Sequence, residues 1–88
     1  MDNEVFDALA NDYRRQIICL LRDGPKSAGE IVRNFDIAQP SISRHLDVLK
    51  KSGIVSTVRD GNQIIYSLNS QTIEDLLIYC AKLLPFDR

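Results

Sequence analysis

The feature that most constrains the fold is the stretch from residue 39 to residue 51, which reads QPSISRHLDVLKK. Ile42, Leu46 and Leu49 follow one another at the i, i+4 and i+7 spacing of a single helical face. The spacing predicts a helix of about three turns with that face packed on a core. Pro40 suits its first turn, where a missing N–H group costs nothing.

The opposite face of this predicted helix is polar. At about 100° per residue, its centre passes through Pro40, Arg44, Asp47 and Lys51, with Ser41 beside them. Ser41 and Arg44 lie one above the other near the N-terminal end, which phosphate groups favour and which contacts base edges in helix-turn-helix proteins. An ordinary solvated face is the alternative interpretation, and the neighbouring segments decide between the two.

The 88 residues are enough for one domain, so residues 1–88 are assigned to a single folded unit. A hydrophobic content of 44% and a charged content of 26% are those of a soluble globular protein. The sequence has no apolar run long enough to span a membrane and no basic-then-apolar leader, so we expect a cytoplasmic protein without a membrane partner. A chain this short often gains stability by pairing with a second copy.

The net charge of −1 and the pI of about 5.7 argue, taken alone, against nucleic-acid binding. The charge is unevenly distributed, however. The first twelve residues hold acidic side chains without a single lysine or arginine, whereas residues 39–63 hold Arg44, Lys50, Lys51 and Arg59 against only two aspartates. This segregation is in the direction that a DNA-facing middle segment requires.

Cys19 and Cys80 lie far apart, without Cys-x-x-Cys spacing, and both fall in apolar helical patterns. We therefore expect two buried structural thiols rather than a redox switch or a metal site. The sequence shows no pairing of a nucleophile with a base, no phosphate loop and no metal-ligand cluster, so an enzyme is not predicted and no cofactor is implied.

Three helices are expected before the central one. Residues 3–10 form the first, and the second runs from a cap at Asn11 or Asp12 to about Arg22, with Arg14 and Arg15 on its outer side. Residues 23–25, Asp-Gly-Pro, end this second helix. Residues 27–30, Ser-Ala-Gly-Glu, form a capping-box pattern that opens the third.

The hydrophobic period changes from 3.6 to 2 after Gly53, which predicts strands at residues 54–59 and 63–68 around an Asp-Gly-Asn turn. Asn69 or Ser70 then caps a last helix that runs to about Leu84. The fold class is mainly α with a small β-hairpin (α+β), a winged helix-turn-helix of element order ααααββα. The last helix is more apolar than a monomer needs, so it either crosses its own core or pairs with another copy.

Several segments resemble the ArsR-type winged-helix family, also called ArsR/SmtB. The resemblance rests on residues 28–32 (AGEIV), 39–55 (QPSISRHLDVLKKSGIV), 60–61 (DG), 65–68 (IYSL) and 9–17 (LANDYRRQI), and it covers roughly residues 5–70. It implies a homodimeric bacterial transcriptional repressor, whose fourth helix enters the major groove and whose wing reaches toward the minor groove or the backbone. It also implies a dimer interface built from the first and last helices, for which the candidates are Val5, Phe6, Leu9, Ile73, Leu76, Leu77, Cys80, Leu83 and Leu84.

The sequence departs from the metal-sensing members of that family. Where they carry cysteines in the third helix, this chain has Ser27, Gly29 and Val32, which cannot hold a soft metal. Where others use histidine on the last helix, this chain has Glu74 and Asp75. The chain therefore resembles the metal-independent branch, which includes autorepressors under the control of other proteins and so adds a regulatory protein to the candidate partners.

We expect double-stranded DNA to be bound by two fourth helices, about 34 Å apart, on an inverted repeat. Base readers are expected to be Ser41, Arg44 and His45, while a half-buried ring packed beside the core is the equal alternative for His45. The remaining candidates for contacts to bases, phosphates or the wing are Gln39, Ser43, Lys26, Ser27, Lys50, Lys51, Arg59 and Asn62. A winged-helix module that binds protein without direct DNA contact is the competing hypothesis.

Overall fold

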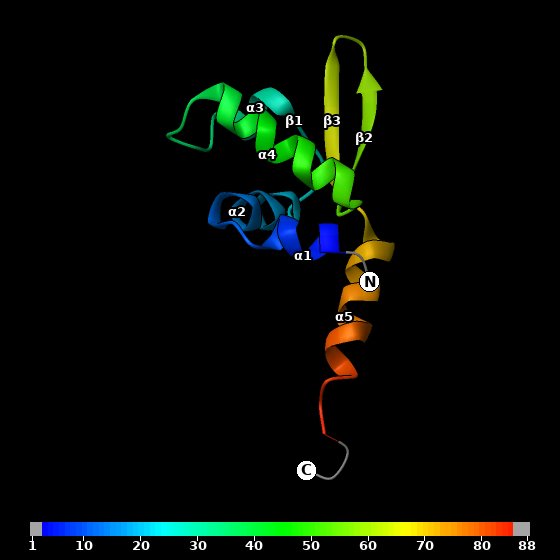
Figure 1. Cartoon of the computed structure of the whole chain (residues 1–88). Coiled ribbons are helices and arrows are strands. Elements are labelled where there is room, and N and C mark those ends of the chain that lie inside the picture. The colour runs from blue at the N-terminus through cyan, green and yellow to red at the C-terminus, as the bar shows by residue number, and fades with distance from the viewer. Residues whose placement is uncertain (1–2, 86–88) are drawn as a thin grey trace.

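The computed structural model describes residues 3–85 and confirms the predicted order of helices and hairpin (Figure 1). The elements are α1 (Asn3–Leu9), α2 (Asp12–Leu21), β1 (Lys26–Ser27), α3 (Ala28–Val32), α4 (Gln39–Ser52), β2 (Val55–Asp60), β3 (Gln63–Leu68) and α5 (Ser70–Ala81). The four leading helices and the sheet make one body, from which α5 extends away from the tip of the β2–β3 hairpin. None of the helices in this described part is both long and apolar enough to traverse a membrane.

Local chemistry sets the helix boundaries. The Asn11 side chain caps α2 by accepting a hydrogen bond from the Arg14 backbone N–H at 3.1 Å. Ser27 and Glu30 form the predicted capping box at α3, with N–O distances of 3.2 and 3.0 Å. Gly53 ends α4 at φ +83°, a left-handed conformation that only glycine adopts without strain.

The sheet has one strand more than the sequence analysis predicted. β2 and β3 pair as the expected antiparallel hairpin, in which Arg59 lies opposite Ile64. The two-residue β1 then pairs with β3, with Lys26 opposite Tyr66, so the strand order is β1-β3-β2. β1 was missed because two residues are too few to show a period of 2.

The core lies under α4. Ile42, Leu46 and Leu49 are at most 2% exposed, which confirms that the apolar stripe of the central helix is its buried face. The other buried apolar residues come from α1, α2, α3 and the start of the hairpin: Val5, Ala8, Ile17, Leu21, Ile31, Ile54 and Val55. Helix α4 is therefore the element on which the other parts of the body pack.

Helix α5 does not cross the core of its own chain. None of its residues is buried; Ile73 and Leu76 pack partly against the core, and Tyr79 contacts Phe6 of α1. The helix ends at Ala81, three residues before the predicted end, and Leu83 and Leu84 follow in turns at 68% and 58% exposure. Of the two alternatives for this apolar helix, the structure excludes the first.

Two sequence-based expectations about buried side chains are wrong. Cys19 and Cys80 are both exposed. Cys19 lies two positions from both Ile17 and Leu21, the buried residues of α2, and is thus about 180° from the centre of their face. Cys80 lies on α5, which the rest of the described chain leaves uncovered. Conversely, the dimer candidate Val5 is only 5% exposed, because its side chain belongs to the core.

Leu49→Ala should lower the free energy of unfolding by about 2–5 kcal/mol, because it leaves a cavity at a side chain with no exposed surface. Urea denaturation followed by circular dichroism measures the change. Lys50→Ala is the matched control on the exposed face of the same helix, and it should change stability by less than about 0.5 kcal/mol. Equal effects of the two substitutions would mean that α4 does not pack on this face.

Candidate nucleic-acid interface

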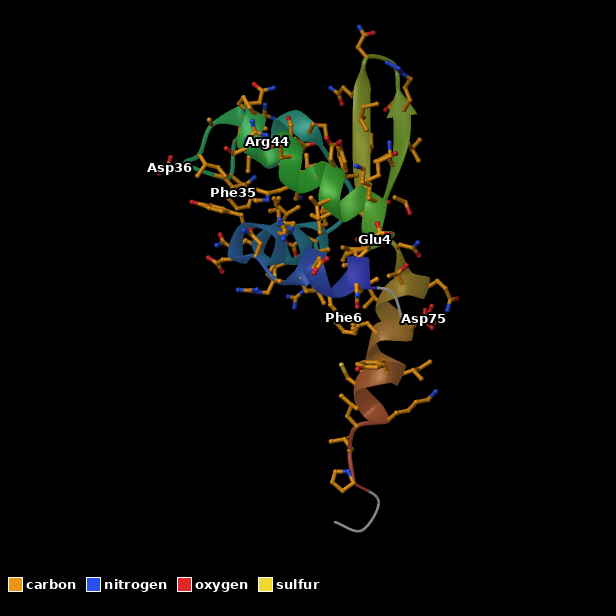
Figure 2. The ribbon with its side chains drawn as sticks, in the orientation of Figure 1. Glu4, Phe6, Phe35, Asp36, Arg44 and Asp75 are labelled. Carbon is orange, nitrogen blue, oxygen red and sulfur yellow. The ribbon has the colours of Figure 1, made fainter. Side chains whose placement is uncertain are left out.

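The exposed face of α4 presents polar side chains over its first two turns. Gln39, Ser43 and Arg44 are exposed and Ser41 is half-buried. Arg44 lies on the side of α4 that faces away from α2 (Figure 2). The N-cap residue Ala38 makes no side-chain hydrogen bond, but its carbonyl accepts the Ser41 backbone N–H at 2.9 Å. Pro40 has no backbone N–H, so the first turn offers few free backbone donors to a phosphate group. This face offers hydroxyl, amide and guanidinium groups, which are the groups that read base edges.

The β2–β3 hairpin forms the second part of the candidate interface. Arg59 and Asn62 are exposed near its tip, where Gly61 takes φ +62° in the turn. The tip projects at the end of the molecule opposite α5, on the same half as the first turns of α4. A guanidinium and an amide at such a tip suit contacts to phosphate or to a groove edge.

The predicted phosphate-binding lysines lie in three different settings. Lys26 is half-buried in β1, whereas Lys50 and Lys51 are exposed in the last turn of α4. Lys51 lines a hollow with Glu4 and Asp7 of α1, so its charge faces carboxylates as well as solvent. The 14 residues of α4 span about 21 Å, which separates these two lysines from the reading end of the helix.

The Ser27 side chain caps α3, and its predicted phosphate contact stays a prediction. It is 7% exposed, and its hydroxyl oxygen already accepts the Glu30 backbone N–H. The Glu30 carboxylate accepts the Ser27 backbone N–H in return, and these bonds hold the pKa of Glu30 below its usual value. The structure confirms the predicted capping role of Ser27.

The His45 ring is half-buried against α2 rather than free on the polar face. It stacks on Tyr13 with ring centroids 5.8 Å apart, and its Nδ1 lies 3.3 Å from Arg14 Nη1. Burial, reinforced by the Arg14 charge, lowers the pKa of His45 from its usual value and so favours the neutral ring. This geometry supports the packing alternative, while base contact by His45 stays an untested prediction.

The role of Arg14 was not predicted, because the helical pattern places this residue on the outer side of α2. Its guanidinium donates to the Ala8 carbonyl at 2.9 Å and to the Asp7 carbonyl at 2.7 Å. The short link between α1 and α2 was the available signal, because the last carbonyls of α1 need donors and Arg14 lies one turn away. Arg33 was also missed, and it lines a hollow of about 310 Å³ with Asn62 and Gln63 of the hairpin.

Within residues 3–85, no group of three or more histidine, cysteine or carboxylate side chains could hold a metal ion. Cys19 instead lines an open hollow between α2 and the α3–α4 turn, beside Arg15, Leu20 and Phe35.

Residues 11–57 match the family described as bacterial regulatory protein, arsR family. The chain is 44% identical over 73 residues to the transcriptional repressor SdpR of Bacillus subtilis, covering 83% of this chain and 81% of that protein. It is 38% identical over 78 residues to a biofilm growth-associated repressor of Agrobacterium fabrum, covering 83% and 67%. It is also 32% identical over 78 residues to the transcriptional activator HlyU of Vibrio cholerae, covering 83% and 72%.

Solved structures agree with these sequence matches. A crystal structure of an ArsR family transcriptional regulator superposes with a TM-score of 0.83 at 29% identity, covering 91% of this chain and 82% of that one. HlyU from Vibrio cholerae gives 0.75 at 30% identity, covering 91% and 87%. These proteins are regulators rather than enzymes, as the sequence analysis predicted. The described fold, the family match and the relatives together show that the chain belongs to the ArsR family of winged helix-turn-helix transcriptional regulators, which bind DNA.

Proposed function

We propose that the protein is a sequence-specific transcriptional repressor that binds an inverted-repeat operator as a homodimer in the cytoplasm. The observation that carries this proposal is the exposed polar face of α4, whose direction is fixed by the buried stripe behind it. The repressor role, rather than activation, follows the named function of SdpR, to which the chain is 44% identical.

Arg44 is assigned to a guanine edge, because a guanidinium pairs with two acceptors of that base in the major groove. Ser41, Ser43 and Gln39 surround it on the same exposed turns and complete the reading surface. Arg59, Asn62 and Lys26 are assigned to the sugar–phosphate backbone, which positions the protein without specifying sequence. His45 and Ser27 are left out of this set, because their side chains are engaged within the fold.

The homodimer is proposed to form through α1 and α5. Leu77, Leu83 and Leu84 are 58–68% exposed, and Tyr79 packs edge-on against Phe6 of α1 with ring centroids 5.3 Å apart. Figure 2 shows Phe6 on the side of α1 that faces α5. These side chains join into an apolar surface of the kind that marks a protein interface. It lies at the end opposite the hairpin tip, so a partner there leaves both reading faces open.

The deciding experiment is selection of bound duplexes from a random DNA pool by the purified protein, at stated salt. We expect an inverted repeat whose half-sites are centred about one helical turn apart. A mobility shift with the selected duplex then gives the affinity relative to random DNA. Recovery of no preferred sequence would contradict the proposal and favour a protein-binding winged helix.

Leu83→Glu should convert the dimer to a folded monomer, because a charge would be buried at the interface but costs little at a side chain that the single chain exposes. Sedimentation velocity at micromolar protein measures the oligomeric state, and circular dichroism checks the fold. Val58→Glu is the matched control, since Val58 is equally apolar and 63% exposed but lies on the hairpin. A wild-type protein that sediments as a monomer would contradict the proposed interface.

Arg44→Ala should leave the fold intact but cost roughly 1–3 kcal/mol of operator binding and relax the preference at one base pair per half-site. Arg59→Ala should weaken binding to all sequences alike and reduce the salt slope by about one unit per lost contact. Both are measured as affinities for operator and random duplex across a salt series. The assignment of Arg44 to a base and Arg59 to the backbone is wrong if Arg44→Ala keeps full discrimination between operator and random duplex while Arg59→Ala loses it.

We also expect repression to be independent of metals, because the residues described offer no three-ligand group. Zinc or arsenite at sub-micromolar free concentration should leave the operator affinity unchanged in the mobility shift. Titration in the presence and absence of a chelator provides the control. A reproducible release of about tenfold that the chelator abolishes would disprove metal independence.

A further inference from the structure

The Arg14 guanidinium connects three helices through separate hydrogen bonds. Its Nε and Nη2 donate to the last carbonyls of α1, those of Ala8 and Asp7, at 2.9 and 2.7 Å. Its Nη1 lies 3.3 Å from Nδ1 of His45 on α4. Arg14 itself belongs to α2. One side chain therefore ties the end of the first helix to the reading half of the fourth.

The protonation state of His45 follows from this contact. Arginine has only donors, so Nδ1 must accept and the ring proton must lie on Nε2. The ring also stacks on Tyr13 at an interplanar angle of 27°, and Tyr13 meets Phe35 edge-on with centroids 6.1 Å apart. His45 is thus held both by its face and by its edge.

The hydrogen bonds of Arg14 connect the two surfaces on which the proposed function depends. His45 directly follows Arg44, the proposed base reader. Helix α1 carries Phe6, which belongs to the proposed dimer surface. The buried stripe fixes the rotation of α4 about its own axis, and the packing of Val5 and Ala8 in the same core contributes to the angle between α4 and α1. A guanidinium with three directed bonds restrains that angle.

We propose that Arg14 and His45 are positioning residues that fix the reading helix relative to the dimer interface and so set the half-site spacing the dimer accepts. This inference rests on the proposed function. Two reading helices must enter grooves about 34 Å apart, so a small change of tilt in each subunit alters their separation. His45 acts here through Arg14 and does not contact DNA.

Three variants separate this role from simple packing. His45→Phe keeps a ring to stack on Tyr13 but removes the acceptor. His45→Asn loses the ring but places an amide oxygen close to the position of Nδ1, and Arg14→Lys keeps the charge but cannot bridge the carbonyls and the ring. Each is assayed with the selected operator, with the same operator carrying one extra base pair between half-sites, and with operators changed at single positions.

Wild type should prefer the native spacing, and His45→Phe and Arg14→Lys should reduce that preference by about tenfold, as expected for loss of a hydrogen bond to a charged group. His45→Asn should restore most of it, and base preferences within each half-site should stay unchanged in all three. A spacing preference in His45→Phe equal to that of wild type would overturn the proposal. Loss of preference at one base pair with unchanged spacing would do so too, because His45 would then be a base reader.

A second measurement tests the contact without DNA. Removing the Arg14 charge in Arg14→Gln should raise the pKa of His45, measured by NMR titration of the ring, because one of its two depressing causes is lost. The other charged or titratable groups on α4 and on the helices packed against it are Glu4, Asp7, Asp12, Tyr13, Arg15, Cys19, Glu30, Arg44, Asp47, Lys50 and Lys51. Lys51→Gln, at the far end of α4, is the control and should leave this pKa unchanged.

The two arms distinguish failure of this inference from failure of the proposed function. An unchanged His45 pKa in Arg14→Gln would show that the contact between Arg14 and His45 does not form, whether or not the protein binds DNA. A shifted pKa with wild-type spacing preference in every variant would leave the repressor function standing and remove the positioning role. A wild-type protein without any preferred operator would overturn the proposed function and this inference with it.

Discussion

Burial of the apolar stripe on α4 is the interaction on which the rest of the structure depends. Ile42, Leu46 and Leu49 are almost completely removed from solvent, and burying each stabilises the fold by roughly 1.5–3 kcal/mol. Turning the helix by one residue would rotate the stripe by about 100° and lose most of that stabilisation. The direction of Arg44 is therefore fixed by residues that never meet the ligand. The polar face contributes little to folding and is free to carry function.

The small size of the chain explains why α5 stays exposed at one end of the molecule while α4 packs on a core nearer the other. With 88 residues the body is large enough to cover one side of α4 but leaves α5 without a buried residue. The molecule is consequently elongated, at 52 × 25 × 22 Å, with the hairpin tip at one end and the apolar helix at the other (Figure 1). A dimer formed at the apolar end would compensate for the small core and, by symmetry, present two reading faces together.

The carbonyl groups at the end of the short helix α1 require hydrogen-bond donors, and Arg14 supplies them. The last carbonyls of a helix lack partners within it and carry partial negative charge, so a cation that donates to them is favourable. Arg14 satisfies two such carbonyls from the next helix and still reaches His45. A capping contact and a link between elements are thereby made by the same side chain. These hydrogen bonds of Arg14 connect the packing of the N-terminal half with the orientation of α4.

The sequence by itself determined the features that depend on local pattern. The stripe of α4, the caps at Asn11 and Ser27, the stop at Gly53 and the hairpin all follow from period or turn chemistry, and the structure confirms them. The exposure of Arg44 followed from the same stripe, because the side opposite a buried face must meet solvent.

Only the tertiary structure decided the features that depend on which elements meet. β1 exists because β3 offers it an edge, and it places Ser27 where 7% of its surface stays exposed. Cys19 is exposed although its helix is apolar, because the core touches a different face of α2. Arg14 and His45 meet across 31 positions of sequence. Such a contact leaves no period or spacing in the chain, since it is produced by the packing of α2 on α4 and not by the conformation of either helix.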